Sequence, residues 1–107
     1  MKGVVYCNGE QAGMIEKTRS GEYIFTYDST YLENPAYPPI SLTLPKSSQL
    51  HKSDVLFPFF YGLLSEGVNK EIQCRLLNID EQDDFGRLLN TAGEDTIGAI
   101  TVKKLDT

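Results

Sequence analysis

The chain has 107 residues, of which 40% are hydrophobic and 23% charged, and its net charge is −5. This length and composition are typical of a single globular domain, residues 1–107, with its own apolar core. The acidic balance argues against direct binding of nucleic acid, which needs clustered Lys and Arg. Because no apolar run approaches the roughly 20 residues that span a bilayer, and no signal-peptide pattern is present, we expect a cytoplasmic protein without membrane contact.

The first 27 residues have the pattern of a three-stranded antiparallel meander. Segments rich in β-forming residues are separated by the turn signals Asn8-Gly9 and Ser20-Gly21. The expected strands are residues 2–8, 11–17 and 22–27. In the third strand, alternation places the aromatic residues Tyr23, Phe25 and Tyr27 on one face.

The middle of the chain predicts an irregular loop followed by a short strand. Residues 28–39 contain three prolines between positions 35 and 39, so we expect a loop that Tyr31 and Tyr37 hold to the domain. Residues 40–44 alternate strictly and predict a strand, and residues 46–52 predict a polar connection.

Three helices are expected before a last strand at residues 97–103. Ser53 is a suitable N-cap for the first helix, which would begin at Asp54 and end at Gly67. The second helix, residues 68–78, has an apolar stripe of Val68, Ile72, Leu76 and Ile79. Asp80 or Asp83 would cap the third helix, which carries the apolar residues Phe85, Leu88 and Leu89 and ends at Gly93.

The order of these elements predicts the fold class. Strands and helices do not alternate as in a parallel doubly wound sheet. We therefore expect an α+β fold, in which an antiparallel or mixed β-sheet is covered on one face by about three helices.

The first predicted helix, residues 54–67, is the strongest functional signal. On helical spacing, six apolar residues share an arc of roughly 180° that we expect to face the core: Val55, Leu56, Phe59, Phe60, Leu63 and Leu64. Phe57 lies on the margin, and Tyr61 points away as a rigid ring with a polar tip that suits a partner contact. Packing of Tyr61 on a neighbouring loop is the alternative. The candidate partner-binding residues are Phe57, Tyr61, Ser65, Glu66, Gly67 and Asn69.

No other pattern predicts chemistry. Asp84-Phe85-Gly86 matches the metal-binding tripeptide of kinases, but the chain has no accompanying catalytic loop or Gly-rich phosphate loop. His51 is expected in a solvated loop, and the acids at 80–84 are expected to cap a helix. Cys7 and Cys74 are expected to be reduced, buried fillers. We therefore expect no catalytic residue, cofactor or metal.

Four segments together carry a resemblance to a known family: residues 41–45, 59–67, 85–89 and 93–100. Over nearly the whole chain, they are similar to the N-terminal subdomain of HipA-type serine/threonine kinase toxins. Ser65 departs from the family pattern, in which Pro often follows the paired leucines. The kinase lobes that hold the ATP-binding and catalytic residues of these toxins are not among the 107 residues, so no catalytic residue is carried over.

A free-standing subdomain of this kind resembles HipS-type antitoxins of HipBST toxin–antitoxin systems. The resemblance implies a non-catalytic antitoxin that binds and neutralises the kinase HipT near its N-lobe and active site. It implies the DNA-binding antitoxin HipB as an indirect partner in the same complex. Two other hypotheses stay open: a structural or activating subunit of a split HipA-like kinase, and an enzyme or part of one.

Overall fold

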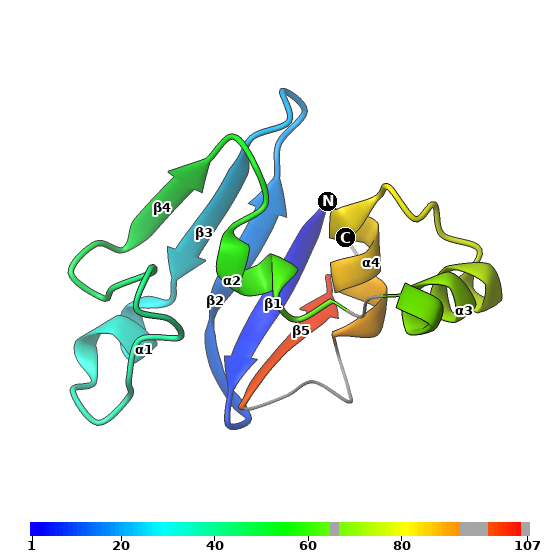
Figure 1. Ribbon diagram of the computed structural model, residues 1–107. Coiled ribbons are helices and arrows are strands. Elements are labelled where there is room, and N and C mark those ends of the chain that lie inside the picture. The colour runs from blue at the N-terminus through cyan, green and yellow to red at the C-terminus, as the bar shows by residue number, and fades with distance from the viewer. Residues whose placement is uncertain (65–66, 93–98, 106–107) are drawn as a thin grey trace.

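The computed structural model describes residues 1–64, 67–92 and 99–105, which form an α+β fold (Figure 1). Its strands are β1 Lys2–Cys7, β2 Glu10–Lys17, β3 Tyr23–Tyr27, β4 Leu50–Ser53 and β5 Ile100–Lys104. Its helices are α1 Ser29–Glu33, α2 Pro58–Tyr61, α3 Gly67–Leu77 and α4 Asp84–Thr91. The strands lie in the order β4-β3-β2-β1-β5, and all neighbours are antiparallel. The predicted fold class is confirmed.

The three N-terminal strands form the predicted meander. Asn8 and Gly9 have φ angles of 52° and 84°, the left-handed backbone that a tight turn between β1 and β2 requires. In β3 the three aromatic residues are buried on one face, as alternation predicts. The last strand, β5, pairs with β1 and buries Ile100 and Val102. Positions 97 and 98 of the expected strand, and the expected helix end at Gly93, lie outside the described residues.

The core lies on the face of the sheet that α2 and α4 cover (Figure 1). Its largest fully buried side chains are Tyr27, Tyr31, Phe25, Phe60, Phe85, Ile15, Leu44, Leu88, Val5 and Val102. Side chains on the opposite face, such as Val4, Met14 and Ile24, remain partly exposed. The sheet therefore has one buried face and one face that is partly open to solvent.

The segment between β3 and α2 differs from the prediction. A short helix, α1, forms within the expected irregular loop, and residues 40–44 form a turn closed by one bridge between Ser41 and Leu44. The buried hydroxyl of Tyr27 explains the turn, because it accepts a hydrogen bond from the Ile40 amide at 3.1 Å and donates one to the Leu44 carbonyl. The fourth strand is β4, which begins in the expected polar connection and ends at Ser53, the residue that was expected to cap a helix.

His51 was expected in a solvated loop, and this is wrong. It belongs to β4, where it is the register partner of Phe25 on β3. The two rings stack with centroids 6.4 Å apart, and His51 Nε2 lies 3.0 Å from the Pro45 carbonyl oxygen. His51 therefore helps to attach the short edge strand to the sheet.

A column of tyrosine rings holds the proline-rich loop to the domain. Tyr31 stacks on Tyr27 with a centroid distance of 5.9 Å, and Tyr37 stacks on Tyr31 at 4.9 Å. The Tyr31 hydroxyl donates to the Pro38 carbonyl at 2.6 Å, and Lys46 Nζ donates to the Tyr37 carbonyl at 2.8 Å. The predicted anchoring by Tyr31 and Tyr37 is confirmed.

The first predicted helix begins later and ends earlier than expected. Phe57 has an extended backbone (φ −53°, ψ 133°), as is usual before proline, and Pro58 opens α2, since proline suits the first position of a helix. Ser53 does not cap a helix: its hydroxyl accepts from the Val55 amide at 3.2 Å in a local turn. Gly67 is the first residue of α3, with φ 62°, and not a helix stop.

Burial of the tyrosine column predicts loss of stability in alkali. Burial is the largest cause that raises the pKa of Tyr27 and of Tyr31 above their ordinary value. The unfolded chain releases these protons near pH 10, whereas the folded protein retains them, so their contribution is fully present below about pH 10 and is lost as pH rises beyond it. We expect the free energy of unfolding in urea to fall between about pH 9.5 and about pH 11.5. A Tyr31→Phe variant should lose less over this range, and a pH-independent wild type would contradict the prediction.

Candidate functional site

The short helix α2 fixes the direction of its exposed tyrosine. Phe60 is fully buried, and its ring centroid lies 5.8 Å from that of Phe25, 6.1 Å from that of Phe57 and 5.3 Å from that of Phe59. Tyr61, the next residue, is 47% exposed. Because successive helical side chains are about 100° apart, burial of Phe60 directs Tyr61 outward. The predicted outer position of Tyr61 is confirmed.

The six candidate partner-binding residues do not share one environment. Tyr61, Gly67 and Asn69 are exposed, whereas Phe57 is a core residue with 6% of its surface exposed. Phe57 precedes α2, so the helical arc that placed it on the margin does not apply to it. Ser65 and Glu66 lie outside the described residues.

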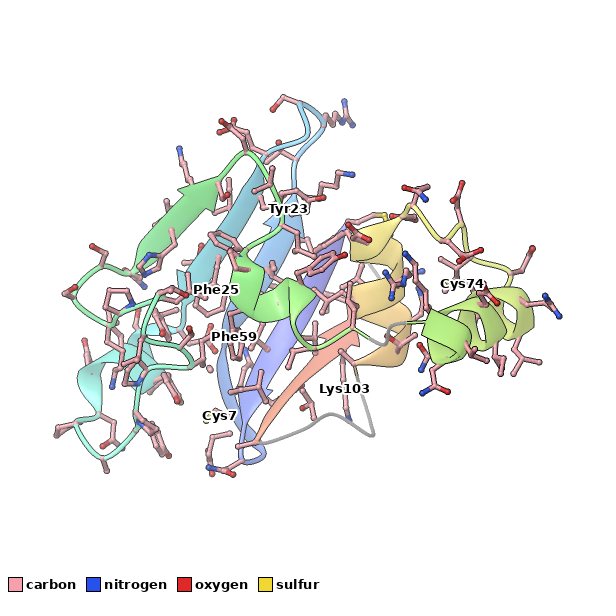
Figure 2. All side chains as sticks on the ribbon, in the orientation of Figure 1. Cys7, Tyr23, Phe25, Phe59, Cys74 and Lys103 are labelled. Carbon is pink, nitrogen blue, oxygen red and sulfur yellow. The ribbon has the colours of Figure 1, made fainter. Side chains whose placement is uncertain are left out.

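The predicted core face of this segment is largely correct. Leu56, Phe60 and Leu64 are buried, and Phe59 and Leu63 pack against the core with part of their surface exposed. Figure 2 shows Phe59, a residue of α2, over the sheet. Val55 is the exception at 65% exposed, because it lies before α2 in a segment without helical spacing.

Helix α3 exposes apolar residues that are not among the six candidate partner-binding residues. Val68, Ile72 and Leu76 are 68%, 47% and 79% exposed. Cys74, which lies on another side of α3, is buried, and α4 is the helix that packs beside α3 (Figures 1 and 2). Three residues of the predicted stripe therefore lie on α3, but they face solvent, and the fourth, Ile79, lies beyond the end of α3 and is partly buried. We call Val68, Ile72 and Leu76 the α3 stripe.

An acidic segment, residues 80–84, connects α3 to α4. Asp83 Oδ1 accepts a hydrogen bond from the Gly86 amide at 3.0 Å, which confirms the predicted helix cap. Asp80 Oδ1 accepts from the Gln82 amide at 2.8 Å. Among the described residues, no group of three or more His, Cys, Asp and Glu could hold a metal ion. The carboxylates therefore order the start of α4 and present negative charge at the surface.

The kinase-like tripeptide lies in the first turn of α4. Phe85 is 1% exposed, and its ring makes an edge contact with that of Tyr23 at 5.7 Å. Asp84 forms an ion pair with Arg87 at 3.3 Å. The predicted core role of Phe85 is confirmed, and the tripeptide is part of a packed helix.

These features define an α+β domain whose exposed ring and apolar helix face suit contact with protein. Within the described ranges, no helix is long and apolar enough to cross a membrane. A family model described as the HipA N-terminal domain matches residues 4–103. The chain belongs to this family.

Two proteins and one solved structure are similar to this chain over most of its length. An uncharacterized protein of Haemophilus influenzae is 36% identical over 104 residues, which cover 95% of this chain and 91% of that protein. The putative kinase Y4mE of Sinorhizobium fredii is 30% identical over 96 residues, which cover 90% of this chain but 23% of that protein. A solved structure described as the N-terminal domain of HipA toxin matches with a TM-score of 0.66 and 32% identity, over 98% of this chain and 94% of that one.

Truncation of two adjacent residues of α2 should change stability by very different amounts. Phe60→Ala removes a fully buried ring, so we expect the free energy of unfolding to fall by about 3–5 kcal/mol. Tyr61→Ala removes an exposed ring and serves as the matched control, with an expected change within about 0.5 kcal/mol. Urea unfolding followed by circular dichroism measures both. A large loss in Tyr61→Ala would show that this ring supports the fold.

Proposed function

We propose that this domain is a non-catalytic antitoxin that binds and neutralises a HipA-like serine/threonine kinase of the HipT type. The observation that carries the proposal is that the domain makes up very different shares of two related proteins. The same domain occupies 23% of a protein named as a putative kinase and 91% of a second relative. A domain that exists in both arrangements is suited to occupy, from a separate chain, the position that the fused domain has in the longer protein.

The exposed surface of the domain supports binding by protein–protein contact. Tyr61 offers a rigid ring at low entropy cost, held in place by the buried Phe60. We propose that Tyr61, with Ser65, Glu66, Gly67 and Asn69 after it, contacts the kinase near its N-lobe and active site. The net charge of −5 would steer the domain toward a basic nucleotide-binding cleft. HipB would join the complex through the kinase.

A structural or activating subunit of a split kinase is the second candidate. It is favoured by the putative kinase relative, in which the domain is a covalent part of the longer protein. Both candidates use the same surface, but they predict opposite effects on catalysis. Adding the purified domain to a purified HipA-family kinase should lower autophosphorylation for an antitoxin, and a rise would overturn neutralisation.

Loss of the Tyr61 ring should weaken neutralisation. Truncating a central aromatic anchor typically costs about 2 kcal/mol or more, which is roughly thirtyfold in affinity. We therefore expect Tyr61→Ala to need a correspondingly higher concentration to inhibit the kinase and to rescue co-expressing cells poorly. Leu42→Ala, which truncates a side chain that is 95% exposed in the turn at residues 40–44, is the control and should inhibit like the wild type. Full inhibition by a folded Tyr61→Ala protein would remove Tyr61 from the mechanism.

A further inference from the structure

Exposed apolar side chains are concentrated on α3. In the described part of the chain, nine large hydrophobic residues are exposed, and four of them belong to this one helix: Val68, Ile72, Leu76 and Leu77. The three residues of the α3 stripe follow each other at four-residue intervals, so they share one face over about 12 Å of helix. A small domain ordinarily buries such a face, and a contiguous exposed apolar patch marks an interaction surface.

The surroundings of the α3 stripe indicate the chemistry of its partner. On helical spacing, Asn69 and Gln73 border the stripe on one side, and Glu71 and Arg75 border it on the other. The acidic segment follows directly, and its Asp80, Glu81 and Asp83 are exposed. An apolar strip beside a run of carboxylates is complementary to an apolar surface bordered by Lys and Arg.

A second copy of this chain is a poorer occupant. Each copy carries a net charge of −5, so two copies repel each other at neutral pH. A basic-rimmed partner gains from the same charge. The putative kinase relative also provides a precedent for a covering partner, since the domain there is continuous with a much longer polypeptide.

We propose that the α3 stripe docks on the HipA-like kinase, against an apolar surface bordered by Lys and Arg. The proposal rests on the proposed function, because it takes that kinase as the occupant. Three side chains along about 12 Å of helix cover only part of the roughly 800 Å² that each partner buries in a stable interface. The acidic segment therefore forms the charged rim of the contact, and Tyr61 of α2 is a second anchor.

The test is isothermal titration of a purified HipA-family kinase from the same organism with matched variants. Ile72→Ser combined with Leu76→Ser should weaken binding about a hundredfold, since each exposed side chain becomes buried on docking. The matched control, Leu42→Ser combined with Leu50→Ser, changes two exposed leucines outside α3 and should bind like the wild type. Leu50 belongs to β4, which lies on the other side of the molecule from α3 (Figure 1). All three proteins should keep the same circular dichroism spectrum and unfolding midpoint.

The outcomes separate this proposal from the function on which it rests. If the wild type binds the kinase and the Ile72/Leu76 variant binds equally well, the docking of α3 is overturned and the proposed function stands. A wild type that does not bind the kinase overturns both. Sedimentation equilibrium of the domain alone should show a monomer, whereas a dimer that the same variant dissociates assigns the stripe to a second copy and overturns the proposal.

The charged rim has its own test. Glu81→Lys should lower the association rate constant several-fold at low salt, and the difference should shrink as salt rises. Glu33→Lys, which reverses an exposed acid on α1 with the same change in net charge, should alter the rate much less. Equal effects of the two reversals would overturn the assignment of the acidic segment to the rim.

Discussion

The contact between the rings of Phe60 and Phe25 is the constraint on which the exposed position of Tyr61 depends. It seats a helix of only four residues against β3 of the sheet. The ring contacts continue from Phe25 through Tyr27 and Tyr31 to Tyr37. One aromatic chain thus joins α2, the sheet and the proline-rich loop, and the packing that builds the core also orients Tyr61 toward solvent.

Local signals in the sequence were sufficient where neighbouring residues decide the structure. The turn at Asn8-Gly9 and the cap at Asp83 were predictable, because both depend on backbone conformation and hydrogen bonds within a few residues. Residues 40–44 were not, although their alternation is strict. The Tyr27 hydroxyl, on strand β3, forms hydrogen bonds with the amide of Ile40 and the carbonyl of Leu44. The local sequence pattern of residues 40–44 does not predict these contacts.

The site was predictable in part for the same reason. Helical spacing gave the outward direction of Tyr61, since it depends only on Phe60 facing the core. It failed for Val55 and Phe57, which precede the proline that opens α2. Helical spacing also placed the residues of the α3 stripe on one face, but it did not show that this face is exposed. Periodicity groups residues on one face and does not reveal whether another element covers that face. The placement of α3 beside α4, which decides this, is a tertiary feature.

The two cysteines occupy positions of different local stability. Cys7 lies in β1, which has a strand paired on each side, whereas Cys74 is the buried residue of a helix whose other apolar side chains are open to solvent. Regions with few buried contacts open at lower free energy than the centre of a sheet. A thiol reagent should therefore modify Cys74 through detachment of α3 alone, and Cys7 only when the sheet comes apart. The chain carries two native chemical reporters, one for the helix and one for the whole domain.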